Sequence, residues 1–226
     1  MTFELQNART ETFNNFDHLY EFVKEEEKRT VRIPLKGLIN SGARFIDDKR
    51  FGVGDNTFHF NEVSFNALCN LAGTTPVFLY KLKDPGLTSD VLTDIFISGK
   101  LNKNPETLEV VCDEDNLQVL GFVSESYVSY SNKDFLCDVI KSHENDNSSD
   151  ASLPSLESFE FENAYSINTR LHMRLTSSKI MGRIEGLGGQ GDDVSKIGLD
   201  ISNSMAGGHA ARLAYFILRL LCANGL

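Results

Sequence analysis

Hydrophobic and polar side chains alternate along the last third of the chain. Three stretches there, 164–175, 179–184 and 196–204, have the period of two that is typical of a half-buried strand. The side chains predicted to face a core are Tyr165, Ile167, Thr169, Leu171, Met173, Leu175, Ile180, Ile184, Ile197, Leu199 and Ile201. Together these stretches predict a three-stranded antiparallel meander.

The stretch that follows Gly207-Gly208 has a different period. Between His209 and Cys222, apolar residues recur at helical spacing, and Asn224-Gly225 is a typical helix stop. The residues of this stripe are Leu213, Phe216, Ile217, Leu220 and Leu221. We therefore predict a helix over 209–222 that covers the apolar face of the meander.

The opposite face of the predicted meander is the main candidate for a binding surface. It would carry a set of cations against one acid, Asp200, and it holds no aromatic residue in this prediction. Such a face favours contact with a nucleic-acid backbone over stacking on bases. The alternative is an ordinary solvent face. The predicted nucleic-acid-binding residues are Arg170, His172, Arg174, Lys179, Arg183 and Lys196.

Helical patterns dominate the part of the chain before residue 142. Helices are predicted at 16–29, 62–71, 77–82, 85–100 and 133–141, and strands at 31–35, 57–60, 107–112 and 117–123. Asn61 and Asn132 are expected to cap helices. The predicted fold class is α+β, with an antiparallel meander sheet packed against helices and a mostly helical N-terminal part. The predicted organisation is an acidic N-terminal part, 1–142, a linker or flexible loop, 143–157, and the meander with its helix, 158–226.

The charge distribution separates the two parts. The net charge of −10 argues against a protein that coats nucleic acid indiscriminately. Residues 1–150 hold 15 basic and 25 acidic residues, whereas 151–226 hold seven of each. A basic cluster between Lys28 and Arg50 is either a second phosphate-facing patch or a loop with scattered charges.

Few residues suggest catalysis or metal binding. The four cysteines, Cys69, Cys112, Cys137 and Cys222, lie in apolar runs without metal or disulfide spacing, and His59 has no neighbouring ligand. The helix pair around Gly73 has helix-turn-helix spacing, but its second helix is mostly apolar. We expect no enzymatic activity and no cofactor.

One alternative keeps catalysis open. If a helix begins at Gly207-Gly208, its free amides could bind an anion near Ser204, His209 and Arg212. A nucleophile pair of Ser204 and His209 is conceivable there, although no acidic partner is evident in the sequence.

Neither a membrane span nor a secretory signal is indicated. The chain has no apolar run of the length needed to cross a bilayer, and Met1-Thr-Phe-Glu-Leu-Gln6 lacks a basic segment followed by an apolar one. We predict a cytoplasmic protein with no membrane contact.

Several segments together resemble a known family. They are Phe60-Asn-Glu-Val-Ser-Phe-Asn-Ala-Leu-Cys-Asn-Leu-Ala-Gly-Thr-Thr-Pro76, Gly121-Phe-Val-Ser-Glu-Ser-Tyr-Val-Ser-Tyr-Ser-Asn132 and Ile197-Gly-Leu-Asp-Ile-Ser-Asn-Ser-Met-Ala-Gly-Gly208. With Arg219-Leu-Leu-Cys-Ala-Asn-Gly225, they resemble the "phage/plasmid-like protein" family of domains on bacterial mobile elements. The most specific positions are Asn203, Ser204, Gly207, Cys222, Asn224 and Gly225.

The resemblance spans about residues 40–226 and implies a phage or plasmid setting in a bacterial cell, without an activity to carry over. Members of the family usually continue past the Cys-x-Asn-Gly signature, so this chain resembles a short version or a fragment. The polar stretch 143–157 resembles an insertion.

Two non-enzymatic functions follow as hypotheses. The first is binding or annealing of single-stranded DNA or RNA, since a meander backed by a helix also resembles the core of single-strand annealing proteins. The second is a protein–protein interaction module, such as an inhibitor of a host factor, which the acidic first part would suit. The sequence leaves the oligomeric state open, a homo-oligomer included.

Overall fold

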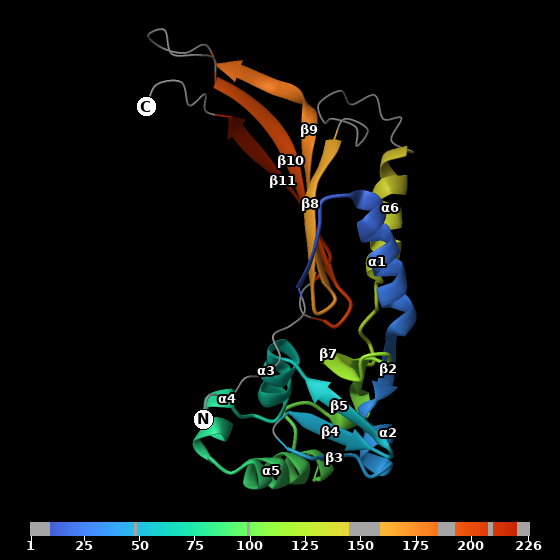
Figure 1. Cartoon of the computed structure of the whole chain (residues 1–226), viewed down its shortest axis with the longest axis vertical. Helices are drawn as coiled ribbons and strands as arrows, with labels where there is room; N and C mark the ends of the chain where they lie inside the picture. The colour runs from blue at the N-terminus through green and yellow to red at the C-terminus, as the bar shows by residue number, and fades with distance from the viewer. Residues whose placement is uncertain are drawn as a thin grey trace.

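The computed structural model describes residues 10–47, 49–98, 100–144, 159–184, 193–207 and 210–220. The described residues form two sheets that follow one another along the long axis of the molecule (Figure 1). The elements in chain order are β1 (Thr10–Phe13), α1 (Phe16–Arg29), β2 (Thr30–Pro34), α2 (Leu35–Asn40), β3 (Arg44–Phe45), β4 (Arg50–Val53), β5 (Asn56–Phe60), α3 (Glu62–Leu71), α4 (Pro76–Lys81), α5 (Pro85–Ile97), η1 (Pro105–Thr107), β6 (Leu108–Asp113), β7 (Gln118–Ser124), α6 (Asn132–Glu144), β8 (Phe159–Ile167), β9 (Arg170–Ile184), β10 (Asp193–Ser204) and β11 (Arg212–Leu220).

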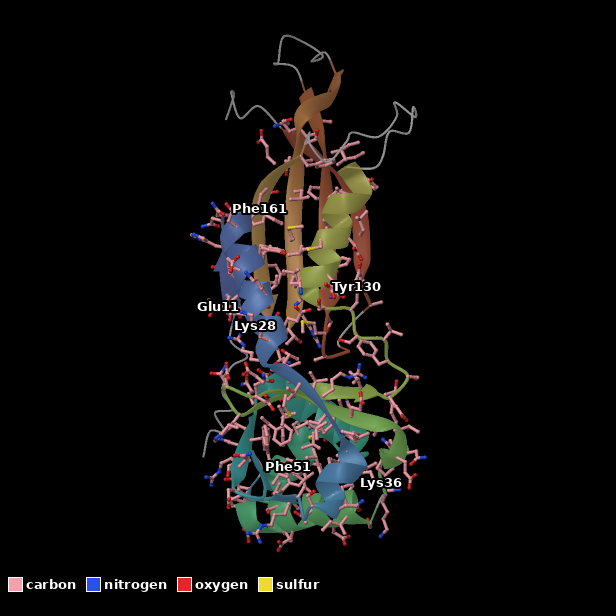
Figure 2. The ribbon with its side chains drawn as sticks, turned by 90° about the vertical axis from the view of Figure 1, so that its right-hand side faces the viewer. Glu11, Lys28, Lys36, Phe51, Tyr130 and Phe161 are labelled. Atoms are coloured by element: carbon pink, nitrogen blue, oxygen red, sulfur yellow. The ribbon has the colours of Figure 1, made fainter. Side chains whose placement is uncertain are left out.

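The first sheet, the meander sheet, has the strand order β1-β8-β9-β10-β11 and is antiparallel throughout. Helices α1 and α6 lie against one of its faces, in front of the strands in Figure 2. The core between them consists of fully or largely buried side chains, namely Leu19, Val23, Phe135, Leu136, Val139, Ala164, Leu171, Met173, Leu175, Leu199 and Ile201. The prediction of an antiparallel meander packed against helices is therefore confirmed. The predicted number of three strands is wrong, since the sheet has five and β9 joins the predicted stretches 170–175 and 179–184 in one strand.

The predicted strand 164–175 is a hairpin instead. Asn168 and Thr169 adopt positive φ angles of 50° and 68° and form a two-residue turn between β8 and β9. Such a turn pairs Ile167 with Arg170, so the parity of the alternation inverts across it. Tyr165 and Ile167 consequently lie on the face opposite the core, while Ala164 and Ser166 are buried. The assignment of Leu171, Met173 and Leu175 to the core was correct.

The predicted helix over 209–222 is wrong for the part that the structure describes. Residues 212–220 form strand β11, which pairs with β10 from Val194 to Ser202 without a register shift. A run that is apolar at nearly every position satisfies both the helical and the strand period, so spacing alone cannot decide between them. The free edge of β10 decides for the strand, and α1 and α6 occupy the place predicted for the helix.

The second sheet, the mixed sheet, has the order β2-β6-β7-β5-β4-β3, in which only the pair β5 and β7 is parallel. Phenylalanines from β3, β4, β5 and α5 form much of its core, for example Phe45, Phe51 and Phe60. The N-terminal part is thus a mixture of strands and helices, and the prediction that it is mostly helical is wrong. Strands β3 and β4 are too short for a period of two to be recognised in their sequence, and β5 ends directly before the helix cap Asn61.

The two sheets are joined by buried asparagines. Asn61 Nδ2 donates to Asn168 Oδ1 over 2.5 Å, and Asn168 Nδ2 donates to the Leu120 carbonyl over 2.7 Å. Asn132 Nδ2 donates to Glu26 Oε2 and to the Thr169 carbonyl, and Asn203 Nδ2 donates to Asn132 Oδ1. Because buried polar groups are costly when unpaired, this network favours one arrangement of the two sheets.

Two sequence predictions change at this junction. Asn132 does not cap α6, since Ser131 Oγ accepts the hydrogen bond from the Asp134 amide instead. Strand β1 and helix α1 precede residue 142 and yet pack in the meander sheet, so the N-terminal part contributes to both sheets. The predicted linker 143–157 lies, from residue 145 onward, outside the described residues.

Candidate nucleic-acid interface

The open face is defined here as the face of the meander sheet opposite α1 and α6. Strand register places three of the predicted site residues, Arg170, His172 and Arg174, on it. Lys196 shares this face because it lies two residues from Gly198 in a regular ladder with β11. The side chains of Lys179 and Arg183 lie outside what the structure describes.

Two aromatic rings also lie on the open face, contrary to the prediction that it has none. Tyr165 pairs with His172 across β8 and β9, and their rings stack with centroids 4.7 Å apart and planes 16° apart. The alternation predicts Tyr165 in the core because it treats 164–175 as one strand without a turn at Asn168 and Thr169. The inverted parity after that turn is the signal that would have placed it here.

Phe216 of β11 supplies the second ring. It pairs with Gly198, where an added Cβ would lie 2.0 Å from the ring, so the ring lies over the β10 backbone. The Arg174 guanidinium carbon lies 5.0 Å from the ring centroid, within the range of a cation–π interaction. A glycine inside a strand often marks the close approach of another group, and Gly198 was the available sequence signal.

Two arginines of the open face take no part in the ion pairs of the described residues. Among the described residues, neither Arg170 nor Arg174 lies within ion-pair distance of a carboxylate, although Asp200 pairs with Arg174 in strand register. Arg212 at the start of β11 adds a further exposed cation, in register with Ser202.

The expectation of a single opposing acid is wrong. Glu160 faces Thr176 in register, and Glu162 Oε2 accepts a hydrogen bond of 2.9 Å from Thr176 Oγ1. A register shift between Phe161 and Asn163 brings Glu162 to this side. Both acids lie toward the end of the sheet remote from Arg170. Arg170, Arg174 and Arg212 lie in the half nearest the mixed sheet, which is therefore the more basic half, while Lys196 lies toward the other end.

Two small hollows have volumes of about 240 and 220 Å³, and the second lies beside Arg170. Each is large enough only for a small group. This second hollow continues the open face toward α3 and is lined by Val63, Ala67, Leu120, Gly121, Phe122, Asn168, Arg170, Ala206 and Gly207. Gly121 and Gly207 allow close packing there, because a Cβ on Gly121 would lie 2.8 Å from the Ala206 carbonyl oxygen and one on Gly207 would lie 2.9 Å from Val123 Cγ1. The open face thus ends in a concave surface at the junction.

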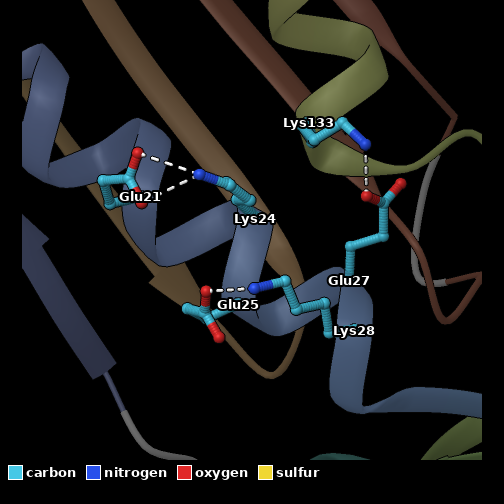
Figure 3. Close-up of polar contacts among 6 residues, drawn as sticks. All are labelled: Glu21, Lys24, Glu25, Glu27, Lys28 and Lys133. Atoms are coloured by element: carbon cyan, nitrogen blue, oxygen red, sulfur yellow. Dashed lines mark hydrogen bonds and ion pairs between the residues drawn. The ribbon is translucent and has the colours of Figure 1, made fainter.

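The basic cluster between Lys28 and Arg50 has the opposite character. Lys28 Nζ lies 2.6 Å from Glu25 (Figure 3), and Lys36 Nζ lies 2.7 Å from Glu106. Arg29 Nε lies 3.0 Å from Asp113, Arg50 pairs with Asp47, and Arg32 pairs with Glu109. Most of this cluster is therefore neutralised within the chain, which disfavours the phosphate-facing alternative.

A polar cleft of about 390 Å³ lies at the junction below α1. Its lining includes Glu26, Arg29, His59 and Asp113. Burial raises the pKa of Glu26, although the hydrogen bond from Asn132 and the charge of Arg29 oppose the shift. His59, predicted to be structural, lies in strand β5, and its amide donates to the Leu117 carbonyl. The charged groups of this cleft are largely engaged with one another.

The described positions that carry the family resemblance make contacts where the two sheets meet. Asn203 belongs to the asparagine network, and the carbonyl of the fully buried Ser204 accepts a hydrogen bond of 2.7 Å from Tyr127. Gly207 has a positive φ of 75° and packs against Val123. Cys222, Asn224 and Gly225 lie outside the described residues. These contacts explain the described motif positions by the joining of the two sheets.

The structure weakens the catalytic alternative. Because β11 replaces the predicted helix, no helix N-terminus follows Gly207 in the part described, and His209 lies outside it. Burial raises the pKa values of Cys69 and Cys112 to about 12, which disfavours the reactive thiolate.

The described residues contain neither a candidate metal site nor a candidate membrane-spanning helix. No group of three or more His, Cys, Asp or Glu side chains there is placed to hold a metal ion. No helix of the described chain has both the length and the apolar content needed to span a membrane.

Comparisons with protein-family models, with curated proteins and with solved structures find no match to this chain. The resemblance to the phage/plasmid-like family thus stays a prediction.

Proposed function

We propose that this chain is a non-enzymatic protein of a phage or plasmid that binds single-stranded DNA or RNA through the open face. The observation that supports this most directly is the combination of Arg170 and Arg174, which lack carboxylate partners in the described chain, with the rings of Tyr165 and Phe216 on the same face. Cations that track phosphates and rings that stack on bases are the two components of single-strand binding.

The spacing of these groups suits an extended strand of nucleic acid. Arg170 and Arg174 lie four residues apart on β9, a separation of about 13–14 Å along the strand. The paired Tyr165 and His172 lie between them in register. A single strand could contact both arginines and place a base near the Tyr165 ring. A duplex keeps its bases stacked inside, so we expect weaker binding of duplex DNA.

The experiment measures fluorescence anisotropy of a labelled oligothymidine and of a duplex of equal length over a range of salt concentrations. We expect tighter binding of the single strand and an affinity that falls linearly with salt on logarithmic axes. The double variant Arg170→Glu/Arg174→Glu should lose affinity about 100-fold, if each reversed contact costs about 1.4 kcal/mol.

The matched control is Lys28→Glu/Lys36→Glu, which changes the net charge equally but in the paired basic cluster. We expect it to change the affinity less than about threefold, since distant charges are screened. Equal losses in both double variants would show that only net charge matters. Retained binding by a folded Arg170→Glu/Arg174→Glu protein, checked by circular dichroism, would exclude the open face.

A protein-interaction module is the second candidate. Helix α4 exposes Val77 and Phe78, whose side chains are 62% and 53% accessible, and the first 150 residues carry the acidic excess. Neighbouring exposed apolar side chains favour a protein contact when they belong to a contiguous patch. Absence of salt-dependent oligonucleotide binding by the wild-type chain would favour this candidate over the first.

A further inference from the structure

The two edges of the meander sheet are protected very differently. Strand β1 has four residues and includes Glu11, whereas β11 has nine residues and no charge from Leu213 to Leu218. The edges of the mixed sheet are also protected, since β2 contains Pro34 and β3 has two residues. Proteins usually protect sheet edges by shortness, charge, proline or bulges. Among the described strands, β11 is the long edge that has none of these inside its apolar run.

Strand β11 also exposes large apolar side chains. Leu213, Tyr215 and Ile217 are 44%, 47% and 76% accessible. In register they neighbour Ile201, Leu199 and Ile197 of β10, and Leu199 and Ile201 are fully buried under α1 and α6. The cover that the helices provide therefore ends one strand before the sheet does.

We infer that β11 pairs antiparallel with β11 of a second copy of this chain, which extends the meander sheet across a two-fold axis. The apolar run is self-complementary in this arrangement. With Phe216 at the axis, Tyr215 of one copy lies opposite Ile217 of the other, and Ala214 lies opposite Leu218. The exposed apolar side chains of both copies would then cover each other.

The charges of β11 are compatible with this occupant. Arg212 and Arg219 flank the uncharged run, so the antiparallel pair centred on Phe216 has Arg212 of one copy opposite Leu220 of the other, and Arg219 opposite Leu213. No arginine therefore lies directly opposite another, and the two Arg212 residues lie about 27 Å apart, where salt screens their repulsion. An acidic partner strand would instead place its carboxylates opposite Leu213–Leu218, a run that contains no cation to pair with them.

This geometry has a consequence for the open face. The two-fold axis of an antiparallel pair is perpendicular to the sheet, so the open faces of both copies point the same way. The Phe216 rings of the two copies would lie side by side. The inference concerns pairing of the protein itself and does not depend on the proposed nucleic-acid binding.

The expected strength of the pairing is modest. An edge of nine residues is about 30 Å long, and stable protein interfaces bury about 1,200–2,000 Å², more than one strand edge supplies on its own. We therefore expect a dimer that dissociates on dilution.

Sedimentation velocity without oligonucleotide, over a wide range of protein concentration, tests this inference. The wild-type chain should shift from monomer to dimer, and Ile217→Lys should weaken the association by about tenfold or more. The control Val128→Lys adds the same charge at a side chain that is 84% accessible and lies outside β11. It should associate like the wild type.

Hydrogen exchange then identifies what covers β11. We expect the β11 amides that face away from β10 to become more protected as the wild-type concentration rises, and to remain unprotected in Ile217→Lys. Tyr215→Lys repeats the test if Ile217→Lys does not fold. A chain that stays monomeric at every concentration overturns the inference. This holds whether the outward-facing β11 amides exchange freely or are protected by another segment of the same chain. Association that survives both lysine variants also overturns it.

Discussion

The basic residues of 28–50 and those of β9 differ in what surrounds them. Lys28, Arg29 and Lys36 each lie within 3.0 Å of a carboxylate oxygen of the same chain. Arg170 and Arg174 lie on an open sheet face beside aromatic rings, without such a partner in the described chain. In the sequence the strand residues are the main candidate for binding phosphate, and the 28–50 cluster is a possible second patch. The comparison teaches that pairing, more than the number of cations, decides which cluster is available to a ligand.

Among the variants that test this comparison, Arg29→Gln is expected to have the largest effect. Asp113 has a side chain only 8% accessible, and the variant leaves it without its cation. The free energy of unfolding, measured with urea, should fall by about 2–3 kcal/mol, because an uncompensated buried charge is costly. Oligonucleotide affinity of the folded variant should not change.

The matched variant Arg174→Gln should show the reverse. It should reduce oligonucleotide affinity and change stability by about 1 kcal/mol or less, the contribution of a cation–π contact. If Arg29→Gln abolishes binding while Arg174→Gln does not, the two clusters have been assigned the wrong roles.

A smaller effect is expected from Tyr165→Ala on the open face. Stacking of a base on an aromatic ring contributes about 1–3 kcal/mol, so the affinity for oligothymidine should fall by about fivefold or more. Tyr165→Phe keeps the ring and should bind like the wild type. Anisotropy titrations of both variants measure the difference. Unchanged affinity in Tyr165→Ala would limit the interface to phosphate contacts.

The smallest effect concerns two neighbouring acids of α1 that should respond to pH with opposite signs. Burial raises the pKa of Glu26, so its favourable contribution is present below the ordinary pKa of glutamate and is lost as pH rises through the raised folded value. The hydrogen bond from Lys133 lowers the pKa of Glu27, so its contribution is present above the ordinary pKa and is lost as pH falls.

Urea denaturation across acidic to neutral pH checks both signs. Relative to wild type, Glu26→Gln should gain stability as pH rises, while Glu27→Gln should lose it. The same sign for both variants would contradict the assigned surroundings of these carboxyl groups, which Figure 3 shows for Glu27.

Local signals predicted the elements whose capping and spacing are self-contained. Helix α1 begins after Asn15, whose side chain accepts from the Asp17 amide, and α3 begins at the capping box of Asn61 and Ser64. The shared face of Arg170, His172 and Arg174 also followed from alternation within one strand. These features depend on residues within a few positions of one another.

The remaining features depend on partners that are distant in the sequence. The run 212–220 is compatible with both helix and strand, and the free edge of β10 decides between them. The turn at Asn168 and Thr169 moves Tyr165 from the predicted core to the open face. Contacts between distant residues also decide which cations are paired, since Asp113, far from Arg29 in the sequence, forms an ion pair with it.

The sequence by itself determined the α+β class, the alternating strand that carries the basic residues, and most helix boundaries, because short-range periodicity and capping encode them. Only the tertiary structure decided which face Tyr165 and Phe216 occupy, which cations are neutralised, and which edge strand is left without a partner. Those properties arise from contacts between segments brought together by folding, and no local pattern records them.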